Sequence, residues 1–305
     1  MPSAPSRPWK MFLPLGIVLL LALCWSIYWF VAIGFAKQRF AAERLHLSTQ
    51  GITLSCSEEN WGGFPFRFEY GCSTPGFIFD GRIEIQPSNL LVVALAYAPW
   101  QAVALIDGPT RIRAAGTDPD HVEHGRAIAA LTLDRTGTAS LSAEVGDVII
   151  PALGSLEKLT LHTRPSPLPE GGTDIAVTVI RPTCEVPGEP AFSLDQASFL
   201  GTLQSGRKLA VERVELQQGS VRYWGSGLLS LDSENRISGK LDTETNNTTA
   251  LLDGVAPYLR FTEQQRAGLQ TMLGVLGNEA KVSLIATDGA LYLGPFRMAV
   301  LPPLY

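Results

Sequence analysis

An uninterrupted apolar run opens the chain and extends from Met11 to Ala36. Ser26 is its only strongly polar side chain, and aromatic residues gather in its second half at Trp25, Tyr28, Trp29 and Phe30. As a helix, this run spans about 39 Å, which exceeds the roughly 30 Å hydrocarbon core of a bilayer. Signal peptides that are cleaved have shorter apolar regions, of about 7–15 residues, which end at small residues. We therefore interpret residues 11–36 as an uncleaved transmembrane anchor, preceded by a short tail, 1–10.

The apolar spacing stays helical for one further segment and then changes at Gly51. Phe40, Arg44 and Leu47 recur at helical intervals, which predicts a juxtamembrane helix over residues 37–50. From Ile52 onward apolar and polar residues alternate, and this is the period of a strand. We predict a β-rich domain over residues 51–305, with candidate halves 51–165 and 172–305 on either side of the loop Arg164–Gly172, which is rich in proline and glycine.

Aromatic residues form a stripe in the first part of this domain. Phe64, Phe66, Phe68 and Tyr70 fall on one face of a strand, whereas Arg67 and Glu69 fall on the other. Such a stripe either packs in the core, which is the commoner outcome, or lines an apolar groove.

Short strand-like runs, separated by Gly, Pro, Asp and Asn, continue along the chain as in an all-β meander. They lie at Phe77–Phe79, Arg82–Ile85, Leu90–Ala96, Gln101–Ile106, Ala127–Leu133, Thr138–Val145, Lys158–Thr163, Asp174–Ile180 and Val211–Gln217.

The last third of the chain adds two hairpins and one helix. One hairpin turns at Glu234–Arg236, and the other pairs Lys281–Ala286 with Ala290–Leu293. Thr262, with Gln265 three residues later, resembles a capping box that opens an amphipathic helix over residues 262–276. The expected fold class is thus mainly β with few helices (α+β). A transmembrane helix leads into a mostly antiparallel sheet, curled into a groove or a barrel-like body, and the C-terminal amphipathic helix packs on it.

The cysteines bear on the cellular compartment. Cys56 and Cys72 are symmetric about position 64, where Gly62, Gly63 and Pro65 predict a turn, so a hairpin would bring them together as a disulfide. That pairing favours an oxidising compartment outside the cytoplasm; two buried free thiols are the alternative. Cys184 has no obvious mate.

The charge is unevenly distributed and excludes one class of partner. The 305 residues have a net charge of −5, but five of the 24 basic residues and one of the 29 acidic residues lie within residues 1–50. The remaining body is therefore strongly acidic and would repel a phosphate backbone, so we expect no nucleic-acid binding. Basic residues flank both ends of the anchor, and the positive-inside rule alone does not choose its orientation.

We find no active site in the sequence, and we expect a protein that is not an enzyme and has no catalytic, cofactor-binding or metal site. His121 and His124 lie near two aspartates, but no zinc-site spacing follows, which favours a solvated loop. The segment Gly201–Lys208 has Arg207 where a phosphate-binding loop needs lysine, and no Ser or Thr follows to hold magnesium. Carboxylates are numerous, but none can be paired from sequence alone.

Two blocks carry a resemblance to a known family. Trp61–Cys72, followed by Pro75, resembles the Gly-Phe-Pro-Phe/Tyr-Arg signature of the domain of unknown function 2125 family, uncharacterised envelope proteins of Gram-negative bacteria. Asp288–Phe296, through Pro302-Pro303, resembles the terminal motif of the same family, and so does the amphipathic helix before it. The layout is also similar to that of AsmA-like envelope proteins, whose anchored sheets form a groove and which are implicated in lipid handling. The resemblance implies an inner-membrane, single-pass protein with a periplasmic body and no cofactor.

Two functions are consistent with these features. In the first, Phe64, Phe66, Phe68 and Tyr70 contact lipids or other hydrophobic molecules in an apolar groove. In the second, the protein is a scaffold for envelope protein partners at the inner membrane. An open apolar groove favours the first function, whereas a closed core with an exposed sheet edge favours the second.

Overall fold

The computed structural model describes residues 9–114, 120–134, 137–151, 153–168, 171–185, 188, 191–204, 207–255, 268, 271, 277, 279–294 and 296–303. Two helices lie in these residues: α1 (Trp9–Thr49) and α2 (Thr248–Val255). The strands are β1 (Ile52–Ser55), β2 (Glu58–Gly62), β3 (Arg67–Ser73), β4 (Gly76–Phe79), β5 (Ile83–Leu95), β6 (Ala98–Ala114), β7 (Asp120–Val122), β8 (Ala127–Leu133), β9 (Ala139–Ile150), β10 (Gly154–Pro165), β11 (Thr173–Ile180), β12 (Thr183–Cys184), β13 (Phe192–Ser193), β14 (Gln196–Gln204), β15 (Lys208–Gln218), β16 (Val221–Leu231), β17 (Ile237–Thr245), β18 (Ala280–Thr287), β19 (Ala290–Leu293) and β20 (Phe296–Val300).

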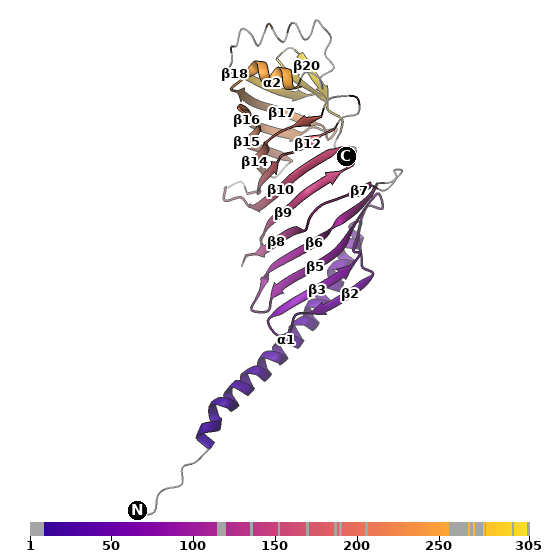
Figure 1. The fold of residues 1–305 in the computed structure, drawn as a ribbon, viewed down its shortest axis with the longest axis vertical. Helices are drawn as coiled ribbons and strands as arrows, with labels where there is room; N and C mark the ends of the chain where they lie inside the picture. Colours follow the sequence, from indigo (N-terminus) through magenta and orange to yellow (C-terminus); the bar gives the residue numbers. More distant parts are fainter. Residues whose placement is uncertain are drawn as a thin grey trace, which may run out of the picture.

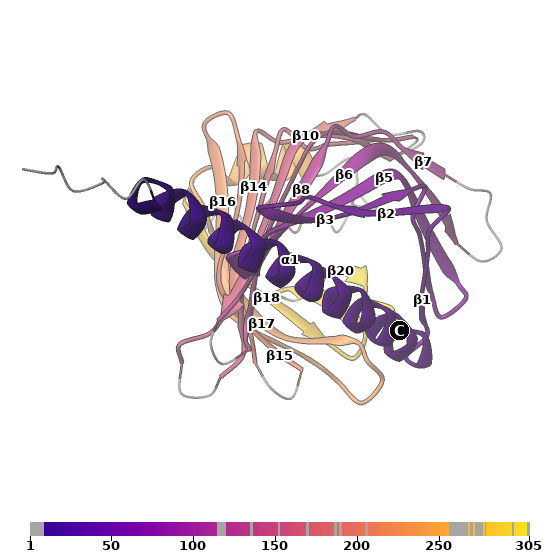
Figure 2. The same cartoon turned by 90° about the horizontal axis from the view of Figure 1, so that it is seen from below.

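The predicted anchor and the predicted juxtamembrane helix form one continuous helix, α1. It is the one helix in the described part of the chain that is long and apolar enough to cross a membrane, although a signal sequence would pass the same test. Its N-terminal half projects away from the sheet, and its C-terminal half runs across the first strands (Figures 1 and 2). The two halves of α1 therefore lie in different surroundings.

All described strands belong to one sheet in which each pairing is antiparallel. The outer edge of β5 is shared, because β4 pairs with its first residues and β3 with its last. From β5 the sheet adds β6, β8, β9, β10, β11 and β14 to β20 in chain order. The prediction of a mainly β meander is confirmed.

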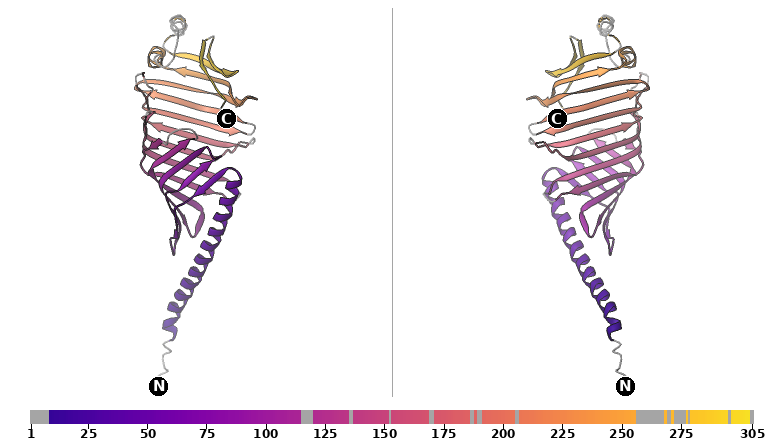
Figure 3. Two further views of the ribbon diagram at one scale, coloured as in Figure 1. Left: turned by 90° about the vertical axis from the view of Figure 1, so that its right-hand side faces the viewer. Right: turned by 90° about the vertical axis from the view of Figure 1, so that its left-hand side faces the viewer.

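The expectation that this sheet curls into a groove or a barrel-like body is wrong, because the sheet stays open. Strands β2 and β20 lie at opposite ends of the molecule, and no described residues of the two pair with each other (Figures 1 and 3). Barrel closure requires a fixed tilt and stagger of all the strands together. Here the strands instead follow one another with a progressive twist, so the two edges move apart.

The two faces of this single-layered sheet differ in polarity. Residues directly opposite each other on paired strands share a face, so the pairing register defines rows across the sheet. The row that starts at Tyr70 continues through Val92, Ala104, Ala129, Ala143, Leu161, Val177, Phe199, Val214, Gly225, Thr243 and Val282. The row on the opposite face that starts at Leu105 continues through Ile128, Glu144, Thr160, Thr178, Ser198, Glu215, Trp224, Glu244 and Lys281. We call the face that carries Tyr70 the front face; it is apolar along nearly the whole sheet.

The described helices cover only the two ends of the front face. Helix α1 packs over β3 and β5, and α2 lies near Leu216 and Tyr223 of β15 and β16. Between them, the front-face residues of β8 to β14 are half-buried by their neighbours in the sheet and are not packed under a described helix. This leaves a long apolar surface on one side of the sheet.

The local predictions for the C-terminal part are largely confirmed. The turns at 232–236 and 287–289 join β16 to β17 and β18 to β19, as the sequence indicates. Helix α2 and strand β20 were not predicted. The predicted helix over 262–276 falls almost entirely outside the described residues. Strand β10 ends at Pro165 and β11 begins at Thr173, and these two strands, which belong to different candidate halves, pair directly.

The turn between β16 and β17 provides a test of stability. The carboxylate of Asp232 accepts hydrogen bonds from the backbone N–H groups of Glu234 (2.8 Å) and Arg236 (2.9 Å) and from Arg236 Nε (2.8 Å). The bond from the Arg236 backbone is the main cause that holds the pKa of Asp232 below its usual value of 3.8. A carboxyl with a lowered pKa stabilises the fold above its unfolded pKa, and this contribution is lost as the pH falls through the folded value.

We therefore expect Asp232→Asn to lower Tm by a few degrees at pH 7, and this difference from the unchanged protein should shrink below about pH 4. Thermal unfolding of both proteins between pH 7 and pH 3 measures it. Glu212→Gln is the control, since it removes another exposed carboxylate but should change Tm little. A Tm difference for Asp232→Asn that is the same at pH 3 and pH 7 contradicts this account.

Candidate functional site

The C-terminal half of α1 packs on the front face through one stripe of side chains. Trp25, Trp29, Ile33, Phe40 and Arg44 follow one another at intervals of four or seven residues, so they project from the same side of the helix. Trp29 and Ile33 are buried against Ala96, Trp61 and Phe68. Further along, Phe40 packs against Tyr70 and Trp61, with ring centroids 4.7 Å and 5.7 Å apart. The largest described core of the protein is therefore the contact between α1 and the first strands.

Three aromatic side chains fix the height of α1 against the sheet. Trp25 Nε1, Tyr28 Oη and Trp29 Nε1 donate hydrogen bonds, each 2.8 Å long, to the carbonyl oxygens of Pro65, Ala96 and Arg67. At its other end, Arg44 Nε donates to the carbonyl oxygen of Leu54, and Arg44 Nη2 pairs with Glu59 at 2.8 Å. These contacts hold the helix in one register along its docked half.

This role of the aromatic cluster was not predicted. From sequence, Trp25, Tyr28 and Trp29 are only part of the apolar run of the anchor. The available signal was chemical, because a buried Trp or Tyr needs a hydrogen-bond partner and backbone carbonyls in turns can provide one.

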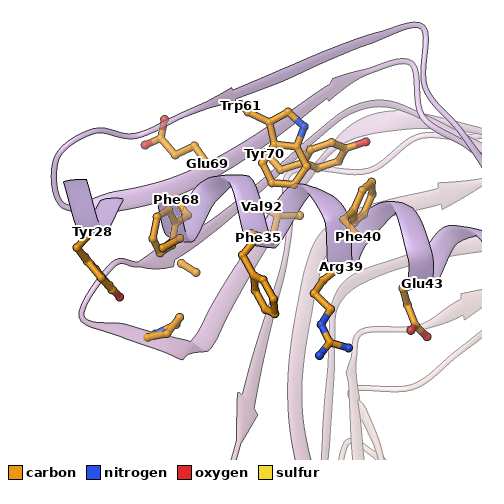
Figure 4. A pocket seen from close by; sticks show the side chains of 14 residues that line it. Tyr28, Phe35, Arg39, Phe40, Glu43, Trp61, Phe68, Glu69, Tyr70 and Val92 are labelled. Atoms are coloured by element: carbon orange, nitrogen blue, oxygen red, sulfur yellow. The ribbon is translucent and has the colours of Figure 1, made fainter. Parts of the chain in front are cut away.

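A cavity of about 640 Å³ lies between α1 and the front face (Figure 4). The sheet contributes Phe68, Tyr70, Val92 and Ala94, and the helix contributes Tyr28, Ala32, Phe35, Ala36 and Phe40. Charged side chains lie near one end, where Arg39 and Glu43 project from the same side of α1 as Phe35 (Figure 4). The cavity is thus an apolar slot with a polar end, and its volume is typical of small-molecule sites.

Tyr70, on the sheet side of the cavity, is neutral in the physiological range. Burial raises the pKa of Tyr70, the charge of Glu59 raises it further, and Arg44 opposes both. The phenol therefore adds no charge to the cavity. Most of the lining side chains are apolar, so this arrangement is suited to binding an apolar group.

The structure divides the predicted lipid-contacting stripe in two. Phe68 and Tyr70 lie on β3 and line the cavity. Phe64 and Phe66 lie in the turn before β3 and are exposed, with their rings near those of α1. Ring centroids are 5.3 Å apart for Phe64 and Trp29, and 6.4 Å apart for Phe66 and Trp25. The helix that covers the stripe is α1.

The predicted disulfide is present between Cys56 and Cys72, with their Cα atoms 5.7 Å apart. Its location differs slightly from the prediction, because Glu59, and not Cys56, pairs with Cys72 in the β2–β3 ladder. Cys56 lies just before β2, and the bond ties this segment to the strand that carries Tyr70. Cys24 and Cys184 are free and exposed.

The other chemical candidates do not assemble into a site. His124 Nε2 lies 2.7 Å from Thr110 Oγ1, whereas His121 is on the exposed surface of β7. Within the described ranges, no group of three or more His, Cys, Asp or Glu side chains could hold a metal ion. The segment Gly201–Lys208 joins the end of β14 to the start of β15.

The disulfide gives a prediction about the stability of the fold. Its closed loop spans a sequence separation of 16 residues, and cross-links of this length stabilise a fold by about 3 kcal/mol through chain entropy. We expect Cys56→Ala/Cys72→Ala to lower the free energy of unfolding by about this amount. Chemical denaturation of the full chain in detergent measures it, and Cys184→Ala is the matched control. Equal stability of the double variant and the control contradicts the prediction.

Comparison with known proteins identifies the family. No curated protein and no solved structure matches this chain. The family model for an uncharacterised protein conserved in bacteria, DUF2125, matches residues 29–302, which confirms the resemblance found in the two sequence blocks. The match begins at Trp29, within the docked half of α1, and extends past β20. The chain therefore belongs to the DUF2125 family of uncharacterised bacterial proteins.

Proposed function

We propose that this protein binds the acyl chain of a membrane lipid in the cavity between α1 and the sheet, and shelters it on the apolar front face. The observation that carries this proposal is the front-face row from Tyr70 to Val282, which is apolar except at Thr243, in a sheet of one layer. A sheet normally buries its apolar face against a second layer. An acyl chain can take the place of that layer.

The cavity provides a route for the acyl chain from a membrane to this face. Its lining begins at Tyr28, within the apolar run of α1, and continues to Arg39 and Glu43. The same lining includes Val92 and Ala94, from which the front-face rows continue into β6 and β8. An apolar chain could therefore pass from the level of the anchor onto the sheet along Phe68, Val92 and Ala94.

We further propose that α1 is an uncleaved anchor in the inner membrane and that the sheet lies in the periplasm. Cleavage after the apolar run would remove Trp25, Tyr28 and Trp29, and with them three hydrogen bonds to the sheet. The disulfide between Cys56 and Cys72 supports an oxidising compartment. The acidic body supports the absence of nucleic-acid partners.

In this proposal the protein is not an enzyme and needs no cofactor. The alternative is an envelope scaffold, in which a protein partner covers the front face. The same half-buried apolar rows of β8 to β14 would then form the interface, so the occupant of the front face distinguishes the two functions.

Photo-crosslinking of the full chain in vesicles identifies that occupant. The vesicles contain phosphatidylethanolamine and phosphatidylglycerol, with a small fraction of a phospholipid that carries a diazirine in its acyl chain. We expect crosslinks on the lining residues of β3 and β5 and on front-face residues of β8 to β11. Ala94→Trp fills the cavity and should reduce the crosslinks on β8 to β11 several-fold.

Val93→Trp is the matched control, since Val93 directly precedes Ala94 on β5 and points to the opposite face. It should leave the crosslinks unchanged. Crosslinks confined to residues 12–24, and insensitive to Ala94→Trp, would overturn lipid binding on the sheet and favour the scaffold.

A further inference from the structure

The free half of α1 is too short to cross a bilayer by itself. Residues 12–24 lie N-terminal to the first contact with the sheet and span about 20 Å, compared with a hydrocarbon core of about 30 Å. Counted from Met11, a span of that thickness ends near Phe30. Trp25 and Trp29, which lie inside this span, are already bound to the turn before β3. The membrane must therefore reach the level of that turn.

The exposed side of the docked half of α1 supports the same position of the membrane. Ile27, Phe30 and Val31 are more than half exposed, with Val31 reaching 67%. Lys37 is the first charged residue after them. In water, these side chains would form a contiguous apolar patch beside the sheet, whereas in lipid they are solvated.

The two turns that meet α1 at this level also expose apolar side chains. Phe64 and Phe66, in the turn before β3, are 51% and 62% exposed. Tyr97, in the turn between β5 and β6, is 61% exposed, and Trp100, near the start of β6, is 51% exposed. The turns are joined because the Ala96 backbone N–H donates to the carbonyl oxygen of Phe66 at 2.9 Å. Tyr28 and Trp25 of α1 bind one turn each.

Charged residues mark the limit of this apolar surface. Arg67 follows Phe66 directly, is mostly exposed and pairs with Glu69 at 3.2 Å. Trp29 Nε1 binds the Arg67 carbonyl, so Arg67 lies near the level where a 30 Å core would end, and its guanidinium can reach the headgroups.

We propose that the turn at 64–66 and the segment 96–100, which is the turn after β5 and the start of β6, insert into the leaflet nearer the sheet. Together with α1 they hold the first strands of the sheet at the membrane. Phe64 and Phe66 contact acyl chains, and Tyr97 and Trp100 lie at the headgroup layer, which such amphipathic rings prefer. This inference rests on the proposed anchor. In this position the Tyr28 end of the cavity opens among the lipids.

Nitroxide labels on the full chain measure the depth of these turns. The labels are attached to Phe66→Cys and Tyr97→Cys, in a Cys24→Ala/Cys184→Ala background, in vesicles of phosphatidylethanolamine and phosphatidylglycerol. Collisions with oxygen report lipid, and collisions with a water-soluble nickel chelate report water. Leu19→Cys in the free half of α1 and Leu168→Cys in the exposed loop after β10 are the two references.

We expect the ratio of oxygen to nickel collisions at Phe66 to be close to that at Leu19 and several-fold above that at Leu168, with an intermediate ratio at Tyr97. A ratio at Phe66 equal to that at Leu168, while Leu19 remains in lipid, overturns insertion of the turns and leaves the anchor intact. A ratio at Leu19 equal to that at Leu168 overturns the anchor and, with it, the insertion.

Discussion

The structure depends on one constraint, which is that a sheet of one layer with an apolar face needs something to cover that face. Among the described helices, α1 provides this cover for β3 and β5, and α2 lies near β15 and β16. Hydrophobic burial is therefore concentrated where Trp29, Ile33 and Phe40 meet the first strands. The half-buried front-face residues of the middle strands follow from the same constraint, because no described second layer lies on them.

The elements and local pairings of this fold could be predicted from sequence to a large extent. The long apolar run, the change of period after Gly51 and the turns at 232–236 and 287–289 depend on neighbours a few residues apart. The disulfide also followed from local symmetry about a turn, even though the ladder that formed is offset from it. These features need only the spacing of residues along the chain.

The arrangement of the elements could not be predicted in the same way. Whether a sheet closes depends on the tilt and stagger of many strands together, and no single strand encodes them. The partner of the aromatic stripe was also missed, since Trp25 and Trp29 lie about 40 residues from the carbonyls that they bind. Both residues also belong to an apolar run that a transmembrane helix already explains. For the candidate site, Phe68 and Tyr70 were found from alternation on one strand, whereas the helix wall and the polar end were not.

Strands β5 to β18 follow one another in the sheet almost in chain order, and each neighbour adds about 4.8 Å to its length. A hairpin inserted into this meander would lengthen the sheet by two strands and leave both the docked helix and the alternation of faces unchanged. The length of the sheet, measured from α1 to its far edge, can thus change in steps of two strands. Evolution could adjust the reach of such a protein without redesigning its attachment.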